Sequence, residues 1–280
     1  MSKNAPFKNI AVIGAGTMGS GIAGQIANSE QEVLLLDIPG KTPNSITEDA
    51  VKKLIRSDPP ALMHKNKANL IKVGNIRDDF NKLANCDLII EAVVERLDIK
   101  KDLYNRINNI VNSKCVITSN TSTIPIKLLV EDMPQSFRER FAITHYFNPV
   151  RFMRLLELVR GEHTKSEIIK KLADYNDRIL GKGVVACNDT PGFLGNRVGV
   201  YALQVGMDEA YKLNLTVEEA DSLMGRPMGI PKTGIFGLYD LIGIDLMSDV
   251  VDTLGTILPD NDDFHKVGAS NIPTAELVKK

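Results

Sequence analysis

The chain has 280 residues, of which 43% are hydrophobic and 25% are charged, as in an ordinary globular protein and unlike a disordered chain. This length allows one large domain or two smaller ones. The formal net charge of −1 provides no overall field that would attract nucleic acid or an anionic membrane.

Two further classes are disfavoured by the pattern of residues. No apolar run reaches the length of a membrane-spanning helix, and a first strand expected at Ile10 leaves no room for a signal peptide. The cysteines Cys86, Cys115 and Cys187 are odd in number and far apart. They match neither a disulfide framework nor metal-ligand spacing, so we expect no metal site and a reducing, cytoplasmic location.

The glycine-rich stretch near the N-terminus predicts a strand, a tight turn and a helix. The apolar residues 10–13 are followed by Gly14, Gly16 and Gly19, the G-x-G-x-x-G spacing of a dinucleotide-binding turn. Gly14 allows the turn, Gly16 lets backbone amides approach a pyrophosphate, and Gly19 lets the helix pack close to the strand. The helix N-terminus then directs free N–H groups at the phosphates, and we count Thr17 and Met18 with the glycines as cofactor-binding.

Another buried strand is predicted over residues 32–36, of which 33–36 are apolar, and it ends in Asp37. An acidic side chain at this place accepts hydrogen bonds from the ribose hydroxyls of adenosine and repels a 2′-phosphate. No arginine follows in residues 38–40, so the expected cofactor is NAD rather than NADP. The alternative, a surface aspartate after an unrelated glycine turn, does not explain the spacing of both features.

The region from residue 38 to residue 80 is less informative. Ser45 or Thr47 is expected to cap a short helix that runs to Arg56 and is ended by the prolines at 59–60. A short strand is expected near residues 71–74. The basic residues of this region either form a solvated surface or make a basic lip for a phosphorylated ligand: His64, Lys65, Lys67 and Lys72.

Strands and helices alternate regularly beyond residue 86. Strands with their exit loops are expected over residues 86–95, 114–118 and 141–145, and a helix over 98–111. This alternation predicts a Rossmann-type, doubly wound parallel sheet. Five residues lie at or just beyond the carboxyl ends of the expected strands, where open parallel sheets bind ligands: Gly14, Asp37, Glu95, Ser122 and His145.

His145 and Glu157 form a candidate base and orienting acid. A single histidine at the end of an apolar strand is more often a core or loop residue, but Glu157 lies in a strand-like aliphatic run where an unpaired carboxylate would be costly. A bond from Glu157 to one ring nitrogen would leave the other nitrogen as a general base. The alternative is a salt bridge from Glu157 to Arg151 or Arg154.

With these motifs, the chain resembles the 3-hydroxyacyl-CoA dehydrogenase family of fatty-acid β-oxidation. The matching stretches run through most of the chain in the family's order: GAGTMGSGIA at 14–23, EAVVE at 91–95, SNTS at 119–122, HYFNP at 145–149 with Glu157, and DTPGFLGN at 189–196. The resemblance implies NAD-dependent oxidation of (3S)-3-hydroxyacyl-CoA to 3-oxoacyl-CoA.

The resemblance also implies roles for individual residues. His145 is the catalytic base paired with Glu157, Ser122 bonds near the substrate oxygen and the nicotinamide, and Asn196 reaches the same site from the following domain. Cofactor contacts are implied for Glu95, Lys100 and Asn148, with Asp37 at the ribose.

The turn at residues 189–192 predicts a boundary between an NAD-binding domain, 1–187, and an all-helical domain for substrate binding or dimerisation, 188–280. Helices are expected over 196–212, from a capping box at 216–219, and over 241–254. The loop 225–234 is either a plain connection or, by resemblance, borders the acyl tunnel or the other half of a dimer-like assembly.

The chain departs from the single-function members of the family. Those usually end with a Lys/Gly-rich segment that contains Gly-Phe-Tyr, which is missing here, and the loop near residues 230–234 looks longer. Both features are closer to the dehydrogenase part of multi-domain β-oxidation proteins, so we expect a shortened chain, a homodimer, or fusion to further domains. Two alternatives stay open: a dehydrogenase of a small CoA-free 3-hydroxy acid, and an NAD-binding remnant without turnover.

Overall fold

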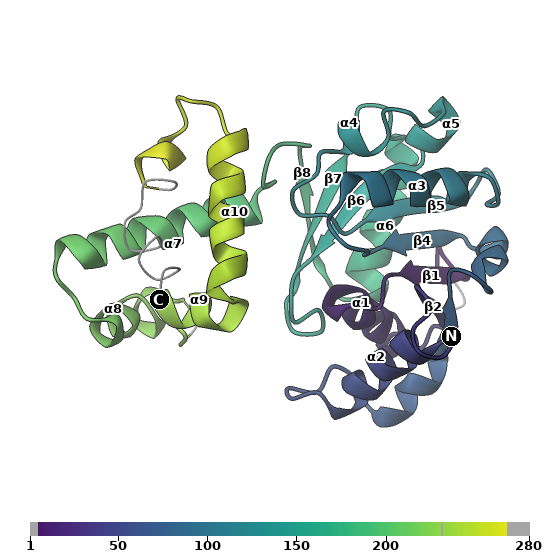
Figure 1. The fold of residues 1–280 in the computed structure, drawn as a ribbon, viewed down its shortest axis with the longest axis horizontal. Helices are drawn as coiled ribbons and strands as arrows, with labels where there is room; N and C mark the ends of the chain where they lie inside the picture. The colour runs from purple at the N-terminus through teal and green to yellow at the C-terminus, as the bar shows by residue number, and fades with distance from the viewer. Residues whose placement is uncertain (1–4, 231, 268–280) are drawn as a thin grey trace. The chain divides into compact units, whose positions relative to one another are not determined.

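The computed structural model describes residues 5–230 and 232–267. The chain divides into two compact units, residues 1–190 and 191–280, the first built on a sheet and the second helical (Figure 1). The division falls three residues later than the boundary expected after 187 (190 − 187 = 3). Residues 188–190 belong with the first unit because the Asp189 carboxylate accepts hydrogen bonds from the backbone N–H groups of Ile126 and Lys127.

The first unit contains an eight-stranded sheet with the order β3-β2-β1-β4-β5-β6-β7-β8. The order runs outward in both directions from β1, which is the doubly wound arrangement expected from the sequence. The strands are β1 Ile10–Ile13, β2 Val33–Asp37, β3 Ile71–Asn75, β4 Leu88–Glu91, β5 Val116–Ser119, β6 Phe141–Tyr146, β7 Leu155–Arg160 and β8 Gly183–Cys187.

One pair of neighbours departs from the expected parallel arrangement. β7 pairs with β6 in the antiparallel sense, and all other neighbours are parallel. The segment 147–154 between β6 and β7 is too short for the crossover that a parallel pair needs, which takes a dozen or more residues. As a consequence, the amino ends of β7 and β8 lie at the same edge as the carboxyl ends of β1 to β6.

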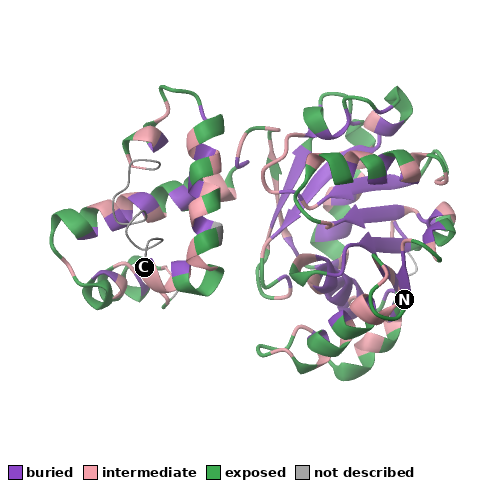
Figure 2. Ribbon diagram, viewed as in Figure 1, coloured by how far each residue is buried: buried purple, intermediate pink, exposed green. Residues whose placement is uncertain are grey.

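Helices cover the sheet on both faces, so its strands are buried while the outer sides of the helices are exposed (Figure 2). Alternate residues of β1 point to opposite faces: Ile10 and Val12 join one core cluster with α1, and Ala11 and Ile13 are buried as well. Burial on both sides explains the unbroken apolar runs of these strands. The helices are α1 Thr17–Asn28, α2 Ser45–Arg56, α3 Leu97–Asn108, α4 Ile126–Leu129, α5 Gln135–Arg138 and α6 Ser166–Asp174.

The start of α2 differs from the expectation. The helix ends at Arg56 as predicted, but the capping position is Asn44, so neither Ser45 nor Thr47 caps it. The Thr47 hydroxyl instead donates to the carbonyls of Asn44 and Gly74. Thr47 therefore ties α2 to β3.

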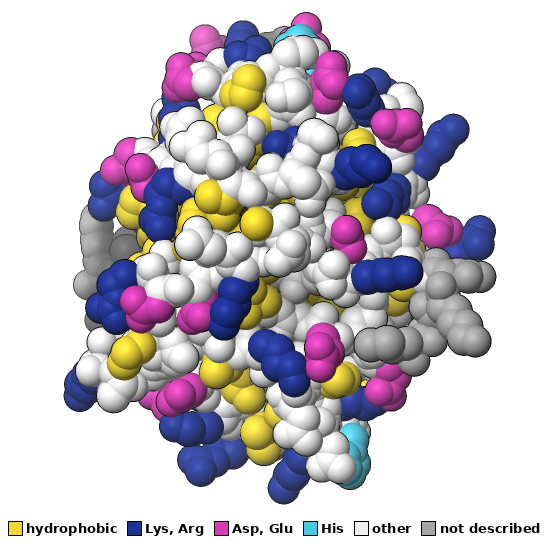
Figure 3. Space-filling view, turned by 90° about the vertical axis from the view of Figure 1, so that its right-hand side faces the viewer, with side chains coloured by type: hydrophobic (Ala, Val, Ile, Leu, Met, Phe, Trp, Pro, Cys, Tyr) yellow, Lys and Arg dark blue, Asp and Glu magenta, His cyan; other side chains and the backbone are white. Residues whose placement is uncertain are grey.

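The basic residues around 64–72 do not form a patch of one sign. Lys67 pairs with Glu30, and Lys72 pairs with Glu32. On the face shown in Figure 3, basic and acidic side chains are interspersed.

The second unit has its own apolar core. Its helices are α7 Gly195–Lys212, α8 Val217–Leu223, α9 Phe236–Ile242 and α10 Ile244–Ile257, and its central side chains include Met207, Tyr239 and Val251. The capping box of Thr216 and Glu219 is confirmed.

The single apolar segment expected over 241–254 is two helices. Gly243 has φ +105° and separates α9 from α10, a conformation that suits glycine. The N-terminus of α9 is held by Asp221 of α8, whose carboxylate accepts from the backbone N–H groups of three successive residues: Ile235, Phe236 and Gly237. Within the described residues, no helix is both long and apolar enough to cross a membrane.

Candidate active site

The glycine turn between β1 and α1 has the shape that the spacing predicts. Gly14 has φ +102°, and a Cβ there would lie 2.3 Å from the Ala92 carbonyl oxygen. A Cβ on Gly19 would lie 1.8 Å from the Gly14 carbonyl oxygen, so α1 approaches the turn as closely as backbone allows. Gly16, by contrast, has nothing within 4 Å of its Cβ position, and no side chain caps α1. The helix N-terminus thus has free N–H groups and open space, which together suit a pyrophosphate.

Asp37 lies directly beside this turn. One carboxylate oxygen accepts from the Ala15 N–H and the other from the Ile38 N–H, at 2.6 Å. The carboxylate is therefore held beside the glycine turn, the place from which an acidic side chain can accept from the ribose of a bound adenosine. Thr17 is exposed in the first turn of α1, whereas the side chain of Met18 is half-buried and packs against the apolar core.

A buried carboxylate, Glu91, organises the next part of the same edge. Glu91 is fully buried at the end of β4, and its oxygens accept from four donors: the Val93 N–H at 2.8 Å, Lys100 Nζ at 2.6 Å, the Tyr104 hydroxyl at 2.5 Å and the Ser119 hydroxyl at 2.7 Å. Burial, together with the charge on Glu91, holds the pKa of Tyr104 well above its ordinary value, so the phenol keeps its proton and donates. The network joins β4, α3 and β5.

Glu95 extends this network toward the surface. It accepts from the hydroxyls of Thr121 and Thr123 and from the Ser122 N–H at 3.3 Å, while Lys100 Nζ lies 3.2 Å from its other oxygen. Burial alone would raise the pKa of Glu95, but the Lys100 ammonium and the threonine hydroxyls outweigh it and hold the pKa below its ordinary value. Glu95 is therefore a carboxylate at neutral pH, and it fixes the backbone that presents Ser122.

Lys100 occupies the interior side of this arrangement. Its side chain is 1% exposed, against 38% for Glu95, so the ammonium is covered by its two carboxylate partners. Glu95 is the more exposed of these two partners, since Glu91 is 0% exposed.

His145 and Glu157 meet across the antiparallel pair β6–β7. They are directly opposite in register, and His145 Nδ1 lies 2.7 Å from Glu157 Oε2. Glu157 is fully buried and the His145 side chain is 8% exposed, and the Phe147 ring lies against the imidazole. The expected contact is thus present in the structure. The Cys187 thiol of β8 lies 3.7 Å from the second Glu157 oxygen, Oε1.

Of the two arginines considered as alternative partners of Glu157, Arg151 makes other contacts. Arg151 donates to the Pro60 and Leu62 carbonyls and stacks over Phe152.

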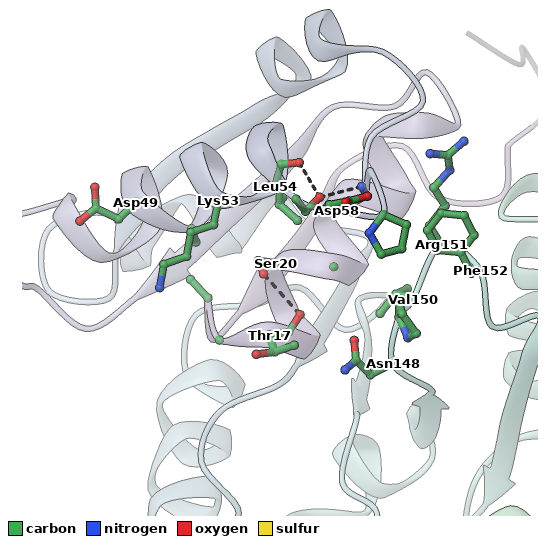
Figure 4. Close-up of a pocket in the computed structure, with 18 of the residues that line it drawn as sticks. Thr17, Ser20, Asp49, Lys53, Leu54, Asp58, Asn148, Val150, Arg151 and Phe152 are labelled. Atoms are coloured by element: carbon green, nitrogen blue, oxygen red, sulfur yellow. Dashed lines mark hydrogen bonds between the residues drawn. The ribbon is translucent and has the colours of Figure 1, made fainter. Parts of the chain in front are cut away.

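A cavity of about 620 Å³ opens beside the glycine turn. Its walls come from the start of α1, from α2, and from the segment between β6 and β7. Figure 4 shows Thr17 and Ser20 on α1, Lys53 on α2, and Asn148 with Val150 on the segment from β6. A cavity of this size is in the range of ligand sites.

The predicted residues of the first unit thus share one edge of the sheet, as the strand pattern requires. Asn196 lies in the first turn of α7, in the second unit, and its role stays a prediction. Among the described residues, no group of three or more His, Cys, Asp or Glu side chains could hold a metal ion.

Sequence reasoning missed two groups that shape this edge, Glu91 and Lys182. A charged residue at the end of the apolar run 88–91 could have marked Glu91 by the argument used for Glu157. Nothing in the local pattern marked Lys182, which is buried behind the segment between β6 and β7.

The first unit has the features of an NAD-binding domain, and a helical unit follows it: a glycine turn, an acidic residue at the end of β2 and a histidine braced by a buried glutamate lie at one edge of a doubly wound sheet. Residues 9–190 match the family described as "3-hydroxyacyl-CoA dehydrogenase, NAD binding domain", and residues 192–276 match the C-terminal domain of the same family. The chain belongs to the 3-hydroxyacyl-CoA dehydrogenase family.

Relatives agree with this placement. A putative fatty acid oxidation complex trifunctional enzyme of Rickettsia felis is 43% identical over 98% of the chain, which spans 38% of that relative. A probable 3-hydroxyacyl-CoA dehydrogenase of Deinococcus radiodurans is 40% identical over 92% of the chain and 75% of the relative. The chain therefore spans well under half of the Rickettsia protein and most of the Deinococcus protein.

Solved structures show the same fold. The Mycobacterium tuberculosis FadB2 structure has a TM-score of 0.82 at 28% identity, covering 98% of this chain and 94% of that one. The (S)-3-hydroxybutyryl-CoA dehydrogenase PaaH1 of Ralstonia eutropha has a TM-score of 0.81 at 28% identity with the same coverage.

Proposed function

We propose that the chain oxidises (3S)-3-hydroxyacyl-CoA thioesters to 3-oxoacyl-CoA thioesters with NAD, as part of fatty-acid β-oxidation. The main support is the buried pair of His145 and Glu157 at the sheet edge that also contains the glycine turn and Asp37. Membership of the family and the names of its relatives support the substrate class.

The residues of the first unit fit NAD. The open space above Gly16 and the α1 N-terminus suit the pyrophosphate, and the Asp37 carboxylate suits the adenosine ribose. Thr17, Asn148 and Glu95 complete the proposed cofactor site, with Lys100 acting through Glu95. When bound, NAD supplies the hydride acceptor.

In the proposed reaction, His145 Nε2 takes the proton of the substrate hydroxyl while the hydrogen on the same carbon leaves as hydride. Glu157, bonded to Nδ1, holds the ring and stabilises the imidazolium that forms. The Ser122 hydroxyl and Asn196 bind the substrate oxygen as it becomes a carbonyl. General-base catalysis of this kind contributes about 10²–10⁴-fold in rate.

A small CoA-free 3-hydroxy acid is the second candidate substrate. A basic lip formed by residues 64–72 would favour a phosphorylated ligand such as CoA, but Lys67 and Lys72 pair with acids, which reduces that support. The names of the relatives are therefore the stronger argument for a thioester.

The test is NADH oxidation by the 280-residue chain, followed by absorbance, with acetoacetyl-CoA and with free acetoacetate in parallel. Turnover of the thioester and not of the free acid is the expected result. Equal turnover of both would favour the CoA-free substrate. NADH binding without turnover of either would favour an NAD-binding remnant and would refute the proposal.

The larger Rickettsia relative suggests a partner arrangement. We propose that the second unit either pairs with a second copy of the chain or packs against further β-oxidation domains, and that the protein acts in the cytoplasm. Cys86 and Cys115 are buried free thiols, which is consistent with a reducing compartment. Size measurement of the purified chain in solution tests the dimer.

A further inference from the structure

The segment from residue 147 to residue 154, here called the rim loop, joins the two strands of the candidate catalytic pair. His145 precedes it on β6 and Glu157 follows it on β7. Asn148 and Val150 of the rim loop line the cavity beside the glycine turn, opposite Thr17 (Figure 4). The shape of the rim loop therefore shapes the cofactor cavity.

The rim loop is packed closely against α1. A Cβ on Gly21 of α1 would lie 2.9 Å from a methyl group of Val150, and Val150 is 3% exposed. Within the loop, the N–H groups of Phe152 and Met153 both donate to the Pro149 carbonyl at 3.0 Å. A shift of this turn by a fraction of an ångström would therefore change the cavity wall.

The turn leaves two carbonyl groups facing inward, and one lysine binds both. The Lys182 ammonium donates to the Val150 carbonyl and, at 3.0 Å, to the Met153 carbonyl. Lys182 precedes β8, whose Gly183 N–H donates to the Arg154 carbonyl at the end of the same loop. The antiparallel turn of β7 places this end of β8 at the active edge, within reach of the rim loop.

Burial of a lysine costs more free energy than burial of an apolar side chain of similar size. Its side chain is 2% exposed, and among the described residues it makes no ion pair. Burial lowers the pKa of Lys182 to about 8, so the ammonium is retained at neutral pH at a cost in desolvation. In this position the ammonium donates hydrogen bonds to two carbonyls that an apolar side chain would leave unpaired.

We propose that Lys182 is a positioning residue for the cofactor: by binding the Val150 and Met153 carbonyls it holds the rim loop in the conformation that receives NAD, without touching NAD itself. This rests on the proposed function to the extent that the cavity beside Gly16 holds the dinucleotide. It adds to that function a residue that sets cofactor affinity from behind the cavity wall.

The experiment compares Lys182→Met with the parent at pH 7. Lys170→Met is the matched control, since Lys170 is exposed on α6 and loses the same charge. NADH affinity is measured by fluorescence titration, and hydrogen exchange is measured on the free protein. We expect Lys182→Met to bind NADH roughly tenfold more weakly, the effect of one lost charge-assisted contact, with faster exchange at Phe152 and Met153 and unchanged exchange in β1. Its kcat at saturating NADH should stay near the parental value, and Lys170→Met should match the parent throughout.

Two results would overturn the inference. Parental NADH affinity or parental exchange in the rim loop of Lys182→Met would show that the lysine does not hold the loop for the cofactor. Faster exchange throughout the first unit would show that it supports the fold as a whole instead. NADH affinity and hydrogen exchange are both measured without turnover. A parent that does not reduce acetoacetyl-CoA would therefore refute the proposed function, whereas the role of Lys182 would still be decided by these two measurements.

Discussion

Replacing Glu157 by glutamine changes the charge of the candidate catalytic pair while keeping its shape. In the parent, a fully buried carboxylate oxygen lies 2.7 Å from His145 Nδ1, so the imidazolium of the proposed proton transfer would have a charged partner. Glutamine can accept the same hydrogen bond but provides no charge. A bond between charged groups contributes about 1.5–3 kcal/mol and a neutral one about 0.5–1.5 kcal/mol.

The difference, roughly 1–2 kcal/mol, corresponds to a fall in kcat of about 5- to 30-fold. The affinity for NADH should stay near the parental value because the glycine turn is not altered. The assay is NADH oxidation with acetoacetyl-CoA at saturating substrate, together with an NADH fluorescence titration. Glu162→Gln, which changes an exposed carboxylate just beyond β7, is the control and should behave as the parent.

A double variant sharpens the test. His145→Gln alone should lower kcat by about 10²–10⁴-fold, and if Glu157 acts only through His145, adding Glu157→Gln should cost nothing more. The reasoning would be refuted if the fall in kcat of the double variant equalled the product of the two single falls, or if Glu157→Gln kept the parental kcat.

Four further outcomes are expected. Gly16→Ala should keep the parental Tm and lose NADH affinity, whereas Gly19→Ala should lower the free energy of unfolding by about 3 kcal/mol. The reason is that in the free protein only the Cβ at position 19 would collide with backbone. Equal Tm values of the two variants would contradict this. Asp37→Ala should raise KM for NADH and improve the relative use of NADPH, which a kinetic comparison of the two cofactors checks. Asp221→Ala should weaken the second unit by about 1–3 kcal/mol, seen as faster exchange in α9, and leave NADH affinity unchanged. The pKa of Lys182 is lowered to about 8 from 10.5, so as the pH rises the folded state releases this proton before the unfolded state does. Between these pH values the free energy of unfolding of the parent should therefore rise relative to that of Lys182→Met, by about 1.4 kcal/mol per pH unit. Equal pH slopes of the two proteins in urea unfolding would refute this prediction.

The cofactor half of the site was accessible from sequence because its determinants are local. Residues 10–37 encode all three of them. Gly14 adopts φ +102°, Gly19 leaves room for the carbonyl oxygen of Gly14, and Asp37 ends the next apolar run. The order of strands and helices then requires that Asp37, Glu95, Ser122 and His145 share one edge. The family match over residues 9–190 and 192–276 confirms the resemblance that these motifs indicated.

Other features of the edge depend on which strands become neighbours. The sequence made a bond between His145 and Glu157 reasonable, but the antiparallel register of β6 and β7 places the two residues opposite each other. The four donors to Glu91 come from β4, α3 and β5, and no short stretch of sequence contains that information.

By itself, the sequence determined the glycine turn, the acid at the end of β2, the alternation that builds a doubly wound sheet, and the family of the chain. The tertiary structure alone decided the direction of β7, the burial of Lys100 beneath Glu95, and the contact of Lys182 with the rim loop. The physical reason is range: backbone dihedral preferences and apolar periodicity act over a few residues, whereas the pairing of buried charges and carbonyls depends on segments that folding brings together from distant parts of the chain.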